Sequence, residues 1–302
     1  MITPKQSLIF LCLFFLPSLS FAEFQSNDEI AIQLIAASKD YPIQQRIKTQ
    51  SGVLLNTPYL AGALGEGVSG KYDQNPLYRF DYFDCETYVD TVMALVLAKN
   101  LTDFRSKINQ IRYKQANVNF TQRNHFPSAD WIPNNKKNGF IRELTYFIAG
   151  QTTKVSRAQI NRRSWYHYLT ADRIQIAYLT PQEKESRLTQ LKSEGETLYF
   201  SKKVSIAYIP VFELLRNPKL RQKIPSGSLI FFVGHDTYLT SRIGTPMNVL
   251  HMGFAIWNKG QLYCRMASSK AKRVLDVRFQ DYLKTYLPLG TLDGISVWAI
   301  QA

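Results

Sequence analysis

Two side chains of this sequence could together carry out nucleophilic chemistry, the thiol of Cys85 and the imidazole of His251. A cysteine attacks a carbonyl carbon as its thiolate, so it needs a base within hydrogen-bond reach to take the thiol proton. Imidazole is suited to that task because its ordinary pKa lies near neutrality. The sequence therefore contains the two groups that a cysteine hydrolase requires, provided that the fold brings them together.

The segment that begins at Cys85 is the strongest predicted helix of the chain. Asp84 directly precedes it and is a favourable helix N-cap. Valines follow Cys85 at helical spacing, so the thiol shares its stripe with an apolar face directed at the core. They are Val89, Val92 and Val96. The positive end of the helix dipole favours a thiolate at Cys85, whereas an ionised Asp84 beside it opposes one.

His251 lies in a segment, residues 249–257, that has the composition of a β-strand. Alternation along that strand places His251 on one face with Gly253 and Ala255, and the larger apolar side chains on the other. A face of Gly and Ala allows a helix to approach closely, so we expect the helix of Cys85 to pack there. A single histidine on a strand is more often structural, but a helix-borne cysteine in the same chain favours a catalytic role. His167 and His235 are interpreted as structural or peripheral.

The remaining pattern predicts an α+β fold in which N-terminal helices pack on an antiparallel sheet. Helices are expected at residues 28–39, 85–99, 102–111 and 181–192, and strands at 198–209, 228–233, 249–257, 261–267 and 295–300. Residues 52–82 and 114–139 are rich in Gly, Pro or Asn without sustained periodicity and are expected to be loop insertions.

The first 22 residues have the pattern of a cleaved signal peptide, with Lys5, a short apolar run and a Ser-Phe-Ala ending. Residues 23–302 are then a single exported domain, located in a periplasm or secreted. Removal of the leader also removes Cys12 and leaves Cys85 and Cys264. These two either form a disulfide with each other, or at least one remains reduced for chemistry.

The net charge of +14 indicates attraction to polyanions. An exported protein meets anionic wall polymers and lipid head groups first, so association with anionic envelope surfaces is an option beside a simply solubilising surface. The basic residues are dispersed and match no nucleic-acid module, so nucleic acid is not an expected partner. The oligomeric state cannot be derived from the sequence.

Four segments in the right order resemble the NlpC type of papain-like cell-wall hydrolase, and most closely its N-acetylmuramoyl-L-alanine amidase-like branch. They are FDCETYV at residues 83–89, PSGSLIFF at 225–232, HMGFAI at 251–256 and ASS at 267–269. The segments RNHF at 123–126 and DWI at 130–132 also have counterparts in that branch. The resemblance covers most of residues 28–300.

This resemblance implies a papain-like core with the cysteine helix on the sheet and His251 on a central strand. Cys85 would attack the amide between N-acetylmuramic acid and L-alanine in peptidoglycan or muropeptides, and His251 would move the proton. The backbone N–H of Cys85 would contribute an oxyanion hole. Alternatives are a peptide-stem endopeptidase of the same fold and a catalytically silent wall-binding or effector protein. No metal or cofactor is expected, because the four histidines show no close ligand pair.

One position departs from the family pattern, since Met266 stands where a histidine usually precedes Ala-Ser-Ser. A thioether cannot orient an imidazolium as a polar group does. Ser268 shares the strand face of Met266 and is the candidate replacement as third catalytic group. Cys264 also shares this face, so oxidation could join it to Cys85. The substitution is the main reason to keep the silent alternative open.

Three further side chains are candidates for lining a substrate cleft: Arg123, His125 and Trp131. A guanidinium suits the carboxylates of a peptide stem, and an indole suits a sugar face or an apolar wall. Each of them, taken alone, is about as compatible with a structural role.

Overall fold

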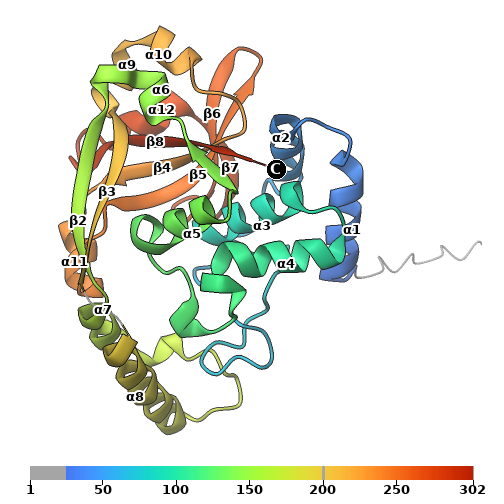
Figure 1. Ribbon diagram of the computed structural model, residues 1–302, viewed down its shortest axis with the longest axis vertical. Helices are drawn as coiled ribbons and strands as arrows, with labels where there is room; N and C mark the ends of the chain where they lie inside the picture. Colours follow the sequence, from blue (N-terminus) through green and yellow to red (C-terminus); the bar gives the residue numbers. More distant parts are fainter. Residues whose placement is uncertain (1–24, 199–200, 302) are drawn as a thin grey trace, which may run out of the picture.

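The computed structural model describes residues 25–198 and 201–301 (Figure 1). The predicted signal peptide, residues 1–22, lies outside the described residues. The chain has the expected α+β architecture, with an eight-stranded sheet in which every pairing is antiparallel. Within the described parts of the chain, no helix is both long and apolar enough to cross a membrane.

The helices and strands alternate more than the sequence pattern indicates. The helices are α1 (Asn27–Ser38), α2 (Ile43–Val53), α3 (Cys85–Leu97), α4 (Leu101–Arg112), α5 (Ile132–Lys137), α6 (Thr145–Ala149), α7 (Arg162–Tyr168), α8 (Pro181–Leu198), α9 (Val211–Arg216), α10 (Pro218–Gln222), α11 (Thr237–Ile243) and α12 (Phe279–Lys284). The strands are β1 (Ile141–Glu143), β2 (Lys154–Asn161), β3 (Ser201–Pro210), β4 (Ser228–Gly234), β5 (Val249–Asn258), β6 (Gln261–Ser268), β7 (Arg273–Arg278) and β8 (Leu292–Ile300). The sheet order is β2-β3-β8-β4-β5-β6-β7, with β1 paired to β8.

Helix α3 is the centre of the molecule. Its first turn is closed by a capping box in which Asp84 accepts from the backbone N–H of Thr87, and Thr87 Oγ1 accepts from the backbone N–H of Asp84. Every residue from Thr87 to Leu97 is buried. A helix that is buried on all sides packs against neighbours in every direction, so its position is determined by the whole core. Only its N-terminal end, with Cys85, is partly open.

The sheet has apolar clusters on both faces. On one face, side chains of β5 such as Met252 and Phe254 pack with α3, and the Phe254 ring lies 5.9 Å from that of Tyr88. The other face carries Ala255 and Met266 and is covered by α6, α9 and α12 (Figure 1). The sheet is therefore a layer between two groups of helices.

The expectation that α3 packs on the Gly253 and Ala255 face of β5 is wrong. The helix packs on the opposite face, against Met252 and Phe254, because large apolar side chains on both partners bury more surface than a bare face does. The small residues of β5 instead leave room for side chains of β6. The ideal Cβ position of Gly253 lies 2.9 Å from Met266 Cβ and 2.7 Å from the Arg265 carbonyl oxygen.

The two predicted insertions differ in character. Residues 54–84 contain no helix and pair with the sheet through an isolated bridge between Pro58 and Arg273 of β7. Residues 114–139 are more regular than expected, with short helical turns that lead into α5. Strand β2 was not predicted, because few of its residues are apolar and most are exposed.

Candidate active site

The thiol of Cys85 lies beside the strand that carries His251. The sulfur faces two backbone N–H groups, that of Met252 on β5 and that of Glu86 in its own helix. Met252 directly follows His251 in the chain. The structure thus places the predicted nucleophile against the backbone of β5, one residue from the predicted base, although the two belong to segments more than a hundred residues apart.

The surroundings of Cys85 hold its thiol in the neutral form. Burial raises the pKa of the thiol, and the negative charges of Asp84 and Glu86 raise it further. The N–H groups of Met252 and Glu86 lower it, but they do not outweigh the other influences. The helix N-terminus therefore does not produce a thiolate here.

The imidazole of His251 is enclosed by one sulfur and two aromatic rings. Its Nε2 lies 3.0 Å from Met266 Sδ. The rings of Phe232 and Tyr282 have their centroids 5.5 Å and 6.4 Å from that of His251. Burial lowers the pKa of His251 to about 4, so the ring is neutral at pH 7.

The contact with Met266 favours one tautomer of the neutral ring. A thioether sulfur is a weak acceptor and cannot donate, so we assign the proton to Nε2. Nδ1 then keeps its lone pair and is the atom able to accept a proton. Within the described part of the chain, no hydrogen bond links this imidazole to the Cys85 thiol, and such contacts often tighten only when substrate is bound. The pair is a neutral thiol and a neutral base.

Three tyrosines lie near Cys85 and were not found from the sequence. Burial, Cys85 and Asp84 raise the pKa of Tyr59 to about 12. Tyr282 and Tyr286 on or after α12 share a hydrogen bond of 2.9 Å between their hydroxyls, and burial raises both of their pKa values, with a further contribution from Cys85. No spacing in the sequence connects α12 with Cys85, so only the fold reveals these phenols.

Ser268 is the last residue of β6, at the start of the turn to β7. Its hydroxyl accepts a 3.1 Å hydrogen bond from the backbone N–H of Ala271, between β6 and β7. The atom in contact with His251 Nε2 is the sulfur of Met266. Cys264 is buried on the same face, opposite Ala255, and both Cys85 and Cys264 are free thiols.

The three candidate cleft residues have internal partners. Arg123 forms ion pairs with Glu66 and Asp73, and although burial opposes it, these carboxylates and Tyr113 raise the pKa of its guanidinium. His125 Nε2 lies 2.8 Å from the Phe120 carbonyl oxygen, and burial followed by Arg123 holds its pKa well below the ordinary value. These two side chains are therefore already engaged in the fold.

Trp131 is 0% exposed, and its indole N–H donates to Asp90 Oδ1 over 2.7 Å. Burial raises the pKa of Asp90 to about 7, against the influence of Arg112 and Trp131. In this conformation the indole is part of the core next to α3, where a sugar cannot reach it.

Replacing Asp84 by Asn should make Cys85 more reactive. Asn is as good an N-cap as Asp, so α3 should keep its first turn, while the negative charge that raises the pKa of the thiol is lost. We expect alkylation of Cys85 by iodoacetamide at pH 8 to become about three to ten times faster, for a pKa decrease of about half to one unit. Asp281→Asn, at an exposed position of α12, is the control, and an unchanged rate in Asp84→Asn would contradict this account.

Replacing Met266 by Gln should raise the pKa of His251. A Gln side chain has nearly the same shape, and its carbonyl oxygen accepts from Nε2–H more strongly than a thioether does, which favours the protonated ring. The imidazole pKa, followed by NMR titration of its ring C–H signals, should rise by about one unit. Met266→Leu keeps the volume without an acceptor and should leave the pKa low. Equal values in the two variants would show that the sulfur contact has no influence.

A family model described as N-acetylmuramoyl-L-alanine amidase-like matches residues 49–290. A crystal structure of a Legionella pneumophila protein, described under the family model DUF1460, is 34% identical in sequence with a TM-score of 0.87 and covers 91% of this chain and 94% of its own. No curated protein sequence matches the chain.

Two more distant structures share the fold. An N-acetylmuramoyl-L-alanine amidase from Bacteroides uniformis is 23% identical, with a TM-score of 0.61, over 86% of this chain and 99% of its own. A putative xylanase from Bacteroides fragilis is 23% identical, with a TM-score of 0.59, over 83% and 98%. The family match extends over most of the chain and contains Cys85, His251 and Met266. The chain belongs to the N-acetylmuramoyl-L-alanine amidase-like family.

Proposed function

We propose that this protein is a cysteine-dependent amidase with a papain-like arrangement of its site, which hydrolyses the bond between N-acetylmuramic acid and L-alanine. The observation that supports the proposal is the place of the Cys85 sulfur against the backbone N–H of Met252, the residue that follows His251, in a chain of an amidase-like family. The family is one of peptidoglycan hydrolases; the cysteine mechanism and the bond are the proposed part.

The neutral pair acts by general-base catalysis. As the Cys85 sulfur attacks the lactyl carbonyl carbon of N-acetylmuramic acid, His251 Nδ1 takes the thiol proton. In this mechanism the backbone N–H of Cys85 stabilises the negative charge that develops on the carbonyl oxygen, and the Met252 and Glu86 N–H groups, which face the sulfur in the free protein, add to the positive potential there. His251 then returns its proton to the nitrogen of L-alanine, which leaves as the free amine of the peptide.

Water completes the reaction. It attacks the carbonyl carbon of the thioester between Cys85 and the lactyl group while His251 accepts one of its protons. The C–S bond then breaks, His251 returns that proton to the sulfur, and the lactyl carboxylic acid departs and ionises in the solvent. The products are a sugar with a free lactyl carboxylate and an intact peptide. We place this reaction outside the cytoplasm, in the periplasm or after secretion, on the basis of the signal-peptide pattern of residues 1–22.

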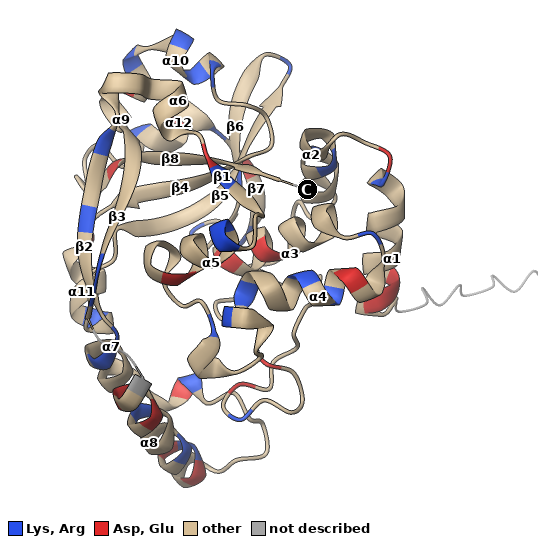
Figure 2. Ribbon diagram, viewed as in Figure 1, with Lys and Arg blue, Asp and Glu red and all other residues tan. Residues whose placement is uncertain are grey.

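The charge of the protein suits an anionic wall without defining a single binding face. Figure 2 shows Lys and Arg on α10, β2, α5 and α8, with acidic residues interspersed on α8. A dispersed positive surface attracts an anionic polymer as a whole and favours encounter over site-specific binding.

The thiol should be essential for cutting and dispensable for binding. Wild-type protein incubated with muropeptides should release free sugar and intact peptide, identified by mass spectrometry, and Cys85→Ala should lose at least about a thousandfold in kcat/KM. Cys264→Ala is the matched control and should retain activity. A shortened peptide still attached to the sugar would identify an endopeptidase instead. If wild type and Cys85→Ala both bind and neither cuts, the protein is a silent binder, as the Met266 contact with His251 would favour.

The acid limb of the activity should lie near pH 4. His251 acts as base only when neutral, and burial lowers its pKa to about 4, so kcat/KM at pH 5 should remain within about twofold of its value at pH 7, whereas an imidazole of pKa about 6.5 would lose most of its activity.

The same shift affects stability. Between pH 6.5 and 4 the unfolded chain binds a proton at His251 that the folded chain does not, so the free energy of unfolding contributed by this residue is complete above pH 6.5 and falls as the pH approaches 4. A His251→Gln variant should show a weaker decrease of melting temperature over that interval. An acid limb near pH 6.5, together with identical pH dependence of stability in the variant, would contradict this assignment.

A further inference from the structure

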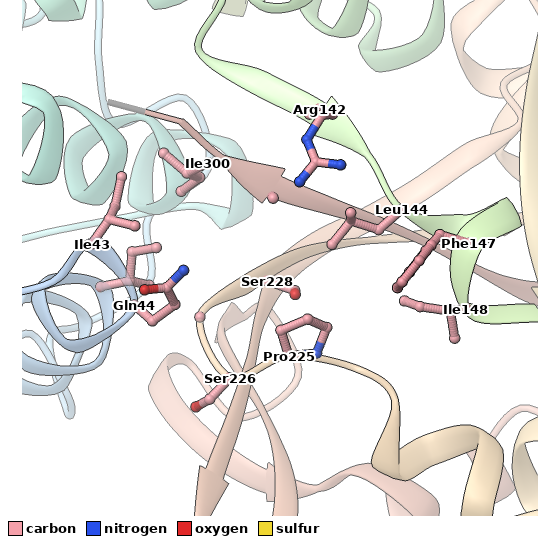
Figure 3. A pocket seen from close by; sticks show the side chains of 13 residues that line it. Ile43, Gln44, Arg142, Leu144, Phe147, Ile148, Pro225, Ser226, Ser228 and Ile300 are labelled. Atoms are coloured by element: carbon pink, nitrogen blue, oxygen red, sulfur yellow. The ribbon is translucent and has the colours of Figure 1, made fainter.

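A hollow lies near the end of β4 that is farther from His251. It has a volume of about 260 Å³ and is bounded by α2, the segment from β1 to α6, and the start of β4 (Figure 3). Ser228 in this hollow pairs with Ala255, whereas His251 pairs with Phe232. The two places are therefore separated by four residues of β4, or about 13 Å at the usual rise of a strand. The volume is slightly below the range of roughly 300–1,000 Å³ for drug-sized ligands, so it suits a small group.

The walls of the hollow are mainly apolar. Ile43 and Ile47 of α2 form one side, and Leu144 and Ile148 form the other. Phe147 lines the rim and is 86% exposed, which is unusual for a large aromatic side chain. An apolar ligand would contact both walls and cover this ring.

Three polar side chains line the same space. In Figure 3 the guanidinium of Arg142 is directed into the hollow on the side of the Ser228 hydroxyl, and Gln44 lines it from α2. Ser228 is 2% exposed, and its Oγ has no hydrogen-bond partner among the described residues. No ion pair to Arg142 occurs within residues 25–198 and 201–301 either.

The Ser228 hydroxyl and the Arg142 guanidinium together favour one kind of ligand. An unsatisfied buried hydroxyl is costly, and a ligand atom that bonds to it removes that cost. A guanidinium presents a planar fork that matches a carboxylate with two parallel hydrogen bonds. One cation in an otherwise apolar hollow fits a ligand with one negative charge better than a phosphate dianion.

We propose that this hollow is a binding site for a small apolar group that ends in a carboxylate. Arg142 and Gln44 hold the carboxylate, Ser228 donates to it, and the apolar part lies between α2 and α6 against Phe147. Both a free short-chain fatty acid and the apolar C-terminal residue of a peptide have this chemistry. The site is separate from Cys85, so the proposal does not depend on the proposed function.

Binding can be measured directly by saturation-transfer NMR titration of the purified protein. Hexanoate represents the free acid, N-acetyl-leucine the chain terminus, and hexanamide is the neutral analogue of the first. We expect at least one carboxylate to bind at least about tenfold more tightly than hexanamide. Whichever carboxylate binds more tightly identifies the source, and equal affinity assigns the site to the shared chemistry.

Variants locate the binding in this hollow. Arg142→Gln should weaken carboxylate binding at least about tenfold, and Ser228→Ala about three- to tenfold. Arg157→Gln removes the same charge from the exposed surface of β2 and should change nothing, and Cys85→Ala should bind as the wild type does. Since Arg142 is exposed, its replacement should leave the melting temperature unchanged.

Three outcomes would overturn the proposal. One is that neither carboxylate binds. Another is that hexanamide binds as well as hexanoate. The third is that Arg142→Gln, with an unchanged melting temperature, binds the carboxylate as tightly as wild type.

Discussion

The complete enclosure of α3 is the constraint on which the other features depend. Because the helix is buried from Thr87 to Leu97, its position is determined by the sheet, by α1, α2 and α4, and by the indole of Trp131. The only part that can face a substrate is the first turn, which the Asp84 capping box holds in shape. A reactive side chain at this end gains a rigid position, and it meets β5 at the Met252 N–H, one residue from His251. Rigid support of this kind is what a nucleophile needs.

Burial also determines the ionisation of the site. Both Cys85 and His251 are shifted toward their neutral forms, the thiol by a raised pKa and the imidazole by a lowered one. In many cysteine sites a polar third group favours the charged pair. Here the imidazole contacts the thioether of Met266, which does not stabilise a protonated ring. The main effect of this contact is to favour the tautomer with the proton on Nε2. The presence of Met266 in place of a polar group is therefore consistent with a neutral thiol at Cys85 and a neutral imidazole at His251.

The helix and strands that carry the candidate site could largely be predicted from the sequence pattern, but the side chains that surround the site could not. The stripe of valines and the Asp84 cap located α3 to within two residues at its C-terminal end, and β-branched runs located β4, β5 and β6. Alternation on β5 correctly separated His251 from Met252, but pattern alone does not tell which face a helix will cover. That choice depends on how well Phe254 and Tyr88 fit together. Tyr282 and the ion pairs of Arg123 arise from contacts between distant segments, for which a single sequence has no signal.

Gly253 influences the surroundings of the His251 imidazole because it lies opposite Met266, the residue that contacts the ring. Its missing side chain leaves the space in which Met266 lies, since a Cβ there would be 2.9 Å from Met266 Cβ. A Cβ at position 253 would also lie 2.7 Å from the Arg265 carbonyl oxygen, a backbone atom that no change of side chain at position 266 removes. Position 253 should therefore remain Gly, and an engineer who wishes to install a stronger acceptor for the ring has position 266 to change.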